Sequence, residues 1–430
     1  MSQLKYKKCE VCASGVASLF FLYYFFSAPT VMAEESLFKD ELSFDSVEQE
    51  LDSYSDSDDV FEAEETNNNK YPGLGVKLSH KLSVNPADNW ETTKQRTELT
   101  LDIKGLLPRS GYGELQINAK RYWPNDSSYA TEISDIEVER AFTQFSSEKW
   151  STKLGKYTIG WGEIEGGPLD VINPIASLTD PIPESQWLIS TTRYWNNSNL
   201  SLFYNQSPNI TKIANVNLND KSNSEFGLRF DLKDDVGDSS IYLARLVPNS
   251  ALKDIANGDS KAHPYQLLGY SANQAIEGYL IKYDIAYKNN LKHNRSGSLV
   301  SVDRIDWGIA LDRQKEDRQW LFTINSKHLV DYYSDFLTPT LTQNVSTRRH
   351  NLSYSLSVND TFDNSDYKWN ILASSTSNGD MKLLSTGIDW DISDQWSSSI
   401  NGTKIIASSD REFSILDGYE RVGIELNYHY

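Results

Sequence analysis

The side chains most able to do chemistry in this sequence gather in one segment rich in glycine and proline, residues 162–185. Three carboxylates and one amide stand close together there: Glu163, Glu165, Asp170 and Asn173. Such carboxylates can favour cations or hydroxyl-rich solutes at a narrow point, or can activate a water molecule in a hydrolase. Because proline and glycine cannot extend a sheet at this density, we expect a shaped loop. The same groups could equally cap and brace that loop.

A hydrolytic site would also need an oriented histidine or a nucleophile motif. The six histidines are scattered along the chain: His80, His263, His293, His328, His350 and His429. None stands in a nucleophile motif, so we expect no enzyme and no catalytic residues. Oxygen ligands are plentiful, but the chain has no twelve-residue calcium loop flanked by helices. We therefore expect neither a metal nor a cofactor.

The elements that must position this loop alternate apolar and polar residues from about residue 75. Leu99, Leu101 and Ile103, for example, alternate with charged and polar neighbours. A period of two predicts strands with one apolar and one polar face. The segments with this pattern are 75–84, 95–104, 112–123, 134–146, 150–161, 186–195, 198–205, 224–233, 239–247, 265–273, 276–288, 302–313, 317–330, 346–359, 365–375, 381–391, 395–408 and 419–430. These are about 18 strands, and 16 is possible because 265–273 is the weakest.

The joins between these segments alternate in length. The long ones are 85–94, 124–133, 162–185, 206–223, 248–264, 289–301, 331–345 and 409–418. Those between them are a few residues, such as 196–197, 274–275 and 392–394. Long loops on one side and short turns on the other are typical of a transmembrane antiparallel up-and-down β-barrel with both termini in the periplasm. A soluble sandwich of half-buried strands is the alternative for any single segment.

Aromatic residues mark the predicted strand ends. The tryptophans concerned are Trp123, Trp150, Trp161, Trp187, Trp195, Trp390 and Trp396. Indole rings prefer the boundary between membrane and water. The last segment carries Tyr428 and ends the chain on Tyr430, which resembles the C-terminal signal by which outer-membrane barrels are recognised for insertion. These patterns indicate an all-β barrel in the outer membrane of a Gram-negative cell.

The glycine- and proline-rich segment also carries a motif. Trp161-Gly162-Glu163 follows the strand that contains Gly155 and Lys156, and Asp170 to Pro174 completes an Asp-x-x-Asn-Pro sequence. This resembles an outer-membrane barrel family of uncharacterised function that is similar in appearance to alginate-export barrels. The match covers about 137–174, and more weakly 265–328. The resemblance implies a passive or export-linked channel.

The chain before residue 73 has a different character. Lys5, Lys7 and Lys8 precede an apolar run and the small residues that end at Ala33, which predicts a signal peptide over 1–33. Both cysteines lie in this segment. The remaining chain would then hold no thiol, which suits an oxidising compartment. We expect three parts: the signal peptide 1–33, an acidic tail 34–72 and a barrel 73–430.

The acidic tail holds most of the net charge of −19. Residues 34–69 contain fourteen acidic residues and one basic residue. Such a segment repels itself and is expected to be disordered in the periplasm, although it could fold on a periplasmic partner. The overall acidity excludes a nucleic-acid partner.

Charged residues on the polar faces of the strands are expected to face the lumen. They are Arg96, Glu98, Asp102, Lys104, Glu114, Lys120, Arg229, Asp231, Lys282, Asp284, Arg304 and Asp306. These side chains could line a permeation path or pair across strands. Both signs are present, so the lumen is predicted to be mixed.

We therefore expect an outer-membrane channel that passes small polar or hydroxyl-rich solutes or cations through a loop-constricted lumen. The outlet barrel of an export system, docked through the acidic tail, is an alternative, and an outer-membrane hydrolase is a lesser one. The expected partners are outer-membrane lipid and the barrel-insertion machinery. The number of copies in an assembly is not indicated by the sequence.

Overall fold

The computed structural model describes residues 73–430 apart from 87–89, 108–110, 125, 127–132, 174–182, 210–222, 235–236, 250–251, 256–259, 340–343, 363–365 and 409–417. The signal peptide predicted for 1–33 and the tail predicted for 34–72 lie outside the described residues. Strands dominate this part of the chain. Among the same residues, no helix is long and apolar enough to cross a membrane.

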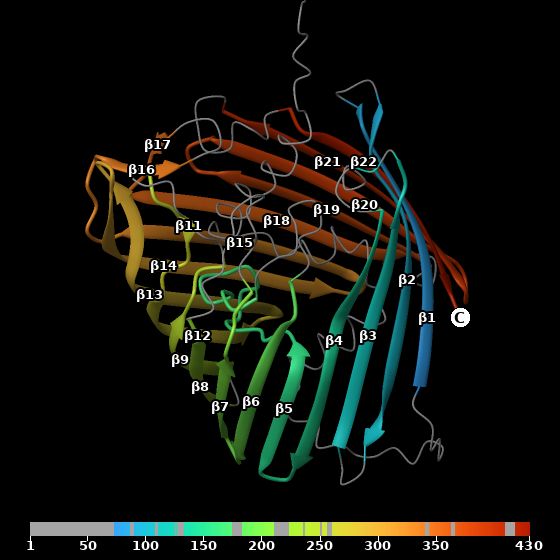
Figure 1. Ribbon diagram of the computed structural model, residues 1–430, viewed down its shortest axis with the longest axis horizontal. Helices are drawn as coiled ribbons and strands as arrows, with labels where there is room; N and C mark the ends of the chain where they lie inside the picture. Colours follow the sequence, from blue (N-terminus) through green and yellow to red (C-terminus); the bar gives the residue numbers. More distant parts are fainter. Residues whose placement is uncertain are drawn as a thin grey trace, which may run out of the picture.

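Eighteen antiparallel strands form a closed barrel, which confirms the predicted fold class and strand number (Figure 1). The strands of the ring are β1 (Gly73–Asn85), β2 (Glu91–Leu107), β3 (Gly111–Tyr122), β4 (Ser134–Ser147), β5 (Trp150–Tyr157), β6 (Gln186–Trp195), β7 (Ser198–Asn205), β8 (Glu225–Asp234), β9 (Gly237–Leu246), β12 (Tyr265–Ile276), β13 (Tyr279–Arg295), β14 (Ser298–Lys315), β15 (Arg318–Leu329), β18 (His350–Phe362), β19 (Tyr367–Thr376), β20 (Met381–Ser393), β21 (Trp396–Ala407) and β22 (Glu420–His429). The ring closes where β1 pairs with β22, from Lys77 opposite His429 to Val84 opposite Val422.

In the described part of the chain, four short strands are additional to the ring. Strand β10 (Leu252–Lys253) pairs with β11 (Ser260–Lys261), both in the connector between β9 and β12. Strand β16 (Phe336–Pro339) pairs with β17 (Asn344–Ser346) in the connector between β15 and β18, and β16 also pairs with the far end of β13. These additions therefore belong to the end of the barrel that carries the long connectors.

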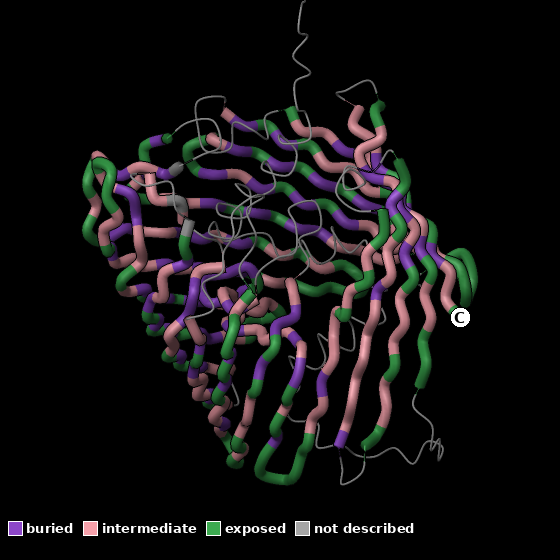
Figure 2. The backbone as a smooth tube through the Cα atoms, in the orientation of Figure 1, coloured by how far each residue is buried: buried purple, intermediate pink, exposed green. Residues whose placement is uncertain are grey.

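The barrel wall is apolar outside and polar inside. Along β1, the side chains of Ser79, Lys81 and Ser83 are buried, whereas Leu78 and Leu82 between them are exposed. The same alternation of buried and exposed positions runs along the strands in Figure 2. It reverses the arrangement of a water-soluble protein, in which large apolar side chains are the buried ones. It is the arrangement expected where the outer face of a barrel meets lipid.

The connectors have the predicted asymmetry, with one main exception. Short turns such as Asn196-Asn197 lie at the end of the barrel where β1 begins and β22 ends. Most connectors at the other end are long. The long loop predicted for 289–301 is wrong. Strands β13 and β14 continue past it: the register of their ladder shifts at a bulge after Lys288, and pairing then resumes from Leu291 opposite Val302 to Arg295 opposite Ser298. A two-residue turn, Ser296-Gly297, then closes the hairpin with both φ angles positive, at 45° and 84°.

Most of the predicted strand-end tryptophans are exposed on the outer face. Trp150 and Trp195, for example, lie at the short-turn end and are 45% and 44% exposed. The prediction for Trp161 is wrong, since β5 ends at Tyr157 rather than at residue 161. The chain leaves the sheet there and turns inward, so the indole of Trp161 is only 4% exposed.

Candidate functional site

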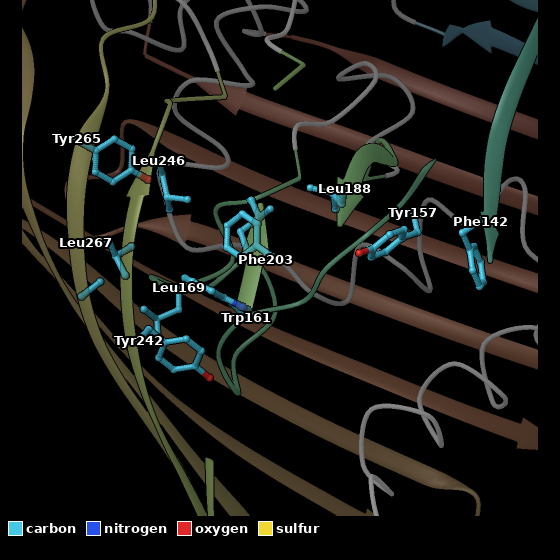
Figure 3. Packing of buried hydrophobic residues seen from close by; sticks show 12 residues of the cluster. Phe142, Tyr157, Trp161, Leu169, Leu188, Phe203, Tyr242, Leu246, Tyr265 and Leu267 are labelled. Atoms are coloured by element: carbon cyan, nitrogen blue, oxygen red, sulfur yellow. The ribbon is translucent and has the colours of Figure 1, made fainter. Parts of the chain in front are cut away.

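Residues 158–173 follow β5 and fold back into the barrel interior; we call them the infolded segment. Trp161 and Leu169 of this segment are 4% and 0% exposed. They pack with inward-facing side chains of the wall, including Phe203 and Tyr242 (Figure 3). The ring centroid of Trp161 lies 5.2 Å from that of Phe203 and 5.1 Å from that of Tyr242. An apolar anchor thus attaches the segment to the wall formed by β7 to β12.

Three inward positions of the wall are glycine where the infolded segment touches them. A β-carbon added at Gly227 would collide with Trp161, and one at Gly269 with Leu169. One at Gly308 would collide with Asn325 of the wall and make a tight 3.1 Å contact with Ile164. Inward glycines on β8, β12 and β14 therefore provide the sockets that receive the apolar side chains of the segment.

Polar anchors complement the apolar one. The carboxylate of Asp284, on β13, accepts hydrogen bonds from the backbone N–H groups of Glu163 at 2.9 Å and Ile164 at 3.2 Å. The hydroxyl of Tyr242 accepts one from the N–H of Gly162 at 3.2 Å. Asp284 is 2% exposed, so its oxygens are satisfied mainly by the segment. Asp284 is one of the residues predicted to face the lumen, and on this inner face it anchors the segment.

The neck of the infolded segment is closed by Asn173. Its side-chain amide donates to the carbonyl of Ile159 at 2.7 Å, and its oxygen accepts from the N–H of the same residue at 3.1 Å. Gln186 at the start of β6 donates to the carbonyl of Ile172 at 2.5 Å. Asn249 donates to the carbonyl of Asn173 at 3.0 Å. These bonds hold the two ends of the segment together.

The carboxylates predicted to form a constriction lie on this same segment. Glu163 accepts a hydrogen bond from Asn273 at 2.7 Å, and Asp170 accepts one from the N–H of Gly166 at 2.9 Å. The side chain of Glu165 is exposed. The four predicted residues are thus brought together on one infolded loop, and at least Asp170 and Asn173 brace it. Their role in selecting solutes stays a prediction.

The predicted lumen-facing residues fall into separate groups rather than one site. Glu98 and Lys120 belong to a row of lysines and glutamates that crosses six strands on their inner face. We call this row the charge ladder. Its members are Lys77, Glu425, Lys81, Glu98, Lys120, Glu137 and Lys156, and successive members are 3.6 to 4.0 Å apart. Arg96 is buried on the same face of β2.

The other predicted lumen residues form local ion pairs. The pairs are Lys104 with Asp102 at 3.0 Å, Arg140 with Glu114 at 3.6 Å, Arg229 with Asp231 at 2.5 Å, and Lys282 with Asp312 at 3.6 Å. The first and third pairs lie within one strand, β2 and β8, and the other two join neighbouring strands. Ion pairing within and across strands therefore accounts for much of the charge that the sequence places on the inner faces.

A cavity of about 120 Å³ lies between the tip of the infolded segment and the wall of β13 to β15. Basic side chains from three adjacent strands line it: Lys288, Arg304 and Lys327. They surround one carboxylate, Asp306, which is 2.8 Å from Lys288 and 2.8 Å from Arg304. Lys261, Lys292 and Asp170 also belong to the lining. The cavity is therefore rich in positive charge, with the negative charge of Asp306 already paired.

The sequence pattern identified Arg304 and Asp306 but not the rest of this basic cluster. Lys288 continues the alternation of Lys282 and Asp284 on β13, so its inward position follows from the same period. Lys261 lies in a connector, where no period places a side chain. Among the described residues, no three or more histidine, cysteine or acidic side chains form a cluster suited to a metal ion.

No family model matches this sequence, and no curated protein is similar to it. Solved structures do share its fold, all at low sequence identity. OccAB3 of Acinetobacter baumannii is 11% identical with a TM-score of 0.53, over 84% of this chain and 99% of that chain. OccK2 (OpdF) of Pseudomonas aeruginosa, in complex with glucuronate, is 7% identical with a TM-score of 0.55, over 83% and 97%.

A third neighbour is the outer membrane protein OpdK of Pseudomonas aeruginosa. It is 7% identical with a TM-score of 0.54, over 83% of this chain and 98% of that chain. These neighbours are outer-membrane porins with an 18-strand barrel. At such identities the likeness is one of fold.

Proposed function

We propose that this chain is a porin-like channel of a Gram-negative outer membrane that passes small polar solutes. The observation that carries the proposal is the closed barrel with an apolar outer face, a polar inner face and an infolded segment anchored inside it. A polar inner face suits a water-filled lumen, and an infolded loop narrows it. In this proposal the two termini and the short turns face the periplasm.

We further propose that the preferred solutes carry a carboxylate and several hydroxyl groups. The cavity beside the infolded segment supports this, because Lys288, Arg304 and Lys327 surround the single carboxylate of Asp306. Guanidinium and ammonium groups form strong charge-assisted hydrogen bonds to carboxylates. A neighbour in fold, OccK2, is described in complex with glucuronate, which is such a hydroxylated carboxylate.

The motif that resembles the alginate-export-like family supports the same class of protein. Its tryptophan, glycine, aspartate and asparagine are used here to anchor and close the infolded segment. An export outlet docked through residues 34–72 stays an alternative, and the tail lies outside the described residues. We propose no catalytic activity, in line with fold neighbours that are porins.

Single-channel recording of the full chain in planar bilayers tests the proposal. We expect discrete current steps, and we expect glucuronate added to one side to reduce them. Deletion of residues 34–69 should leave the steps intact. If the deletion abolished export in cells while the currents remained, the export outlet would be favoured. A folded protein that gives no current steps at all would overturn the channel proposal.

A further inference from the structure

The outer face of the barrel holds an arginine caged by two tryptophans. Arg193 lies near the end of β6, directly opposite Trp150 of β5, and Trp195 follows it on the same strand face. Its guanidinium carbon lies 5.1 Å from the ring centre of Trp150 and 5.0 Å from that of Trp195. All three side chains are exposed. A cation thus faces outward between two indoles at one end of the barrel.

The turns and apolar side chains around Arg193 indicate how deep its guanidinium lies in the membrane. The turns Glu148-Lys149 and Asn196-Asn197 adjoin it, both at the short-turn end of the barrel (Figure 1). Away from that end, the outer face continues with large apolar side chains: Leu154 of β5, Ile189 of β6 and Leu202 of β7. Indole rings prefer the membrane–water boundary. The guanidinium of Arg193 therefore stands at headgroup level, with a wall suited to acyl chains beside it.

Two other arginines that face outward at this end bind side chains of the protein itself. Arg318 is 2.6 Å from the carboxylate of Asp360, and Arg313 donates to the hydroxyl of Tyr279 at 2.5 Å. Among the described residues, no carboxylate lies within 4.0 Å of the Arg193 guanidinium. The charged groups of the nearest turn are Glu148 and Lys149, one of each sign. The guanidinium of Arg193 lies between two indole rings and is available to bind an anion from outside the protein.

We propose that Arg193, Trp150 and Trp195 form a binding site for the phosphodiester of a phospholipid in the leaflet at the short-turn end. The planar guanidinium suits two phosphate oxygens, and the indoles suit the glycerol and carbonyl region. The acyl chains then run along Leu154, Ile189 and Leu202. This inference rests on the proposed placement of the barrel in the outer membrane.

Native mass spectrometry of the delipidated full chain in detergent, titrated with phosphatidylglycerol, tests the site. We expect one lipid to bind ahead of the others, and R193Q to weaken that first binding at least 5-fold. The matched control R318Q removes an outward arginine that the protein already pairs, and should leave the first binding unchanged. R193K should bind better than R193Q because it keeps the charge. Equal first binding by R193Q and the parent chain would overturn the proposal.

Two further measurements distinguish a lipid site from a phosphate site and from a defect of the channel itself. Inorganic phosphate at millimolar concentration should not displace the lipid; full displacement would identify a phosphate site and overturn the lipid assignment. R193Q should keep the single-channel conductance of the parent chain, because Arg193 lies on the outer face. If the parent chain gave no current, the channel proposal would fail. If the parent chain gave normal current but bound no lipid selectively, only the lipid-site proposal would fail.

Discussion

At the scale of single residues, the carboxylate of Asp284 links the infolded segment to the wall. We expect D284A to leave the backbone N–H groups of Glu163 and Ile164 without their acceptor. A buried donor without a partner costs about 1–3 kcal/mol. The segment should therefore loosen, with a lower free energy of unfolding in urea and larger, noisier single-channel currents.

The neighbouring Asp312 offers a matched control for this prediction. It faces the same lumen, and in the described part of the chain its polar partners are Lys282 at 3.6 Å and Gln319 at 3.1 Å, both outside the infolded segment. D312A should therefore change the currents far less than D284A. If both variants behaved alike, the currents would report the general charge of the lumen rather than the anchor.

The glycine sockets give a second prediction at this scale. A β-carbon at Gly227 would collide with Cη2 of Trp161 and stand 2.5 Å from Cε1 of Phe203. Overpacking of this kind costs about 1–3 kcal/mol. We expect G227A to push the indole out of its site, which tryptophan fluorescence of the folded barrel should detect as a red shift. At Gly75 the added carbon would meet Asp102 at an ordinary 3.7 Å, so G75A should have no effect.

At the scale of elements, the charge ladder holds the seam of the barrel. Lys81 of β1 reaches Glu98 of β2 at 4.0 Å and Glu425 of β22 at 3.7 Å, and all three are almost fully buried. We expect K81M to destabilise the closure, because it leaves the buried carboxylates of Glu98 and Glu425 with one cation each, Lys120 and Lys77. The loss should be smaller than about 3–5 kcal/mol, the cost of a buried pair that is fully broken. The heat-induced mobility shift in gel electrophoresis measures this as a lower transition temperature.

An exposed pair provides the comparison. Lys404 of β21 forms an ion pair with Glu420 of β22 in which the lysine is 54% exposed. Exposed pairs contribute about 0–1 kcal/mol. K404M should therefore shift the transition little. A shift as large as that of K81M would contradict the assignment of the seam to the buried ladder.

The strands could be predicted because their faces differ so strongly. Leu99 and Glu98, for instance, must lie on opposite faces, and a period of two places both without any tertiary information. The continuation of β13 to Arg295 cannot be predicted from that period, because a bulge interrupts it after Lys288. The position of Trp161 cannot be predicted from its residue type, because indole rings occur both in apolar clusters and at a membrane boundary.

At the scale of the whole molecule, the site depends on contacts between distant parts of the chain. The sequence indicated a shaped loop with Glu163 and Asp170, but the wall that receives it is drawn from β7 to β14. No local pattern joins Asp284 to a segment about 120 positions earlier. The basic cavity likewise arises only when the tip of the segment meets three adjacent strands. The loop chemistry was therefore predictable, whereas its counterpart on the wall was not.

The infolded segment and the barrel wall predict opposite ion selectivities. The loop carboxylates alone predict cation preference, whereas the cavity beside them brings Lys261, Lys288, Arg304 and Lys327 against the paired Asp306 and against Asp170. Glu163 and Asp170 already accept hydrogen bonds within the barrel. We therefore expect anions to be preferred, with a reversal potential of that sign in a salt gradient at low ionic strength, where screening is weak.

The double variant K261Q/K327Q should move the reversal potential towards cations and weaken the block by glucuronate, because it removes two positive charges from the lining. K404Q removes an exposed lysine outside this lining and should leave both readings unchanged. The prediction would be contradicted if the parent chain preferred cations and K261Q/K327Q did not alter that preference. Selectivity would then be determined by Glu163, Glu165 and Asp170. The basic cavity would then be a structural ion-pair cluster, and solutes would be selected at the infolded segment itself.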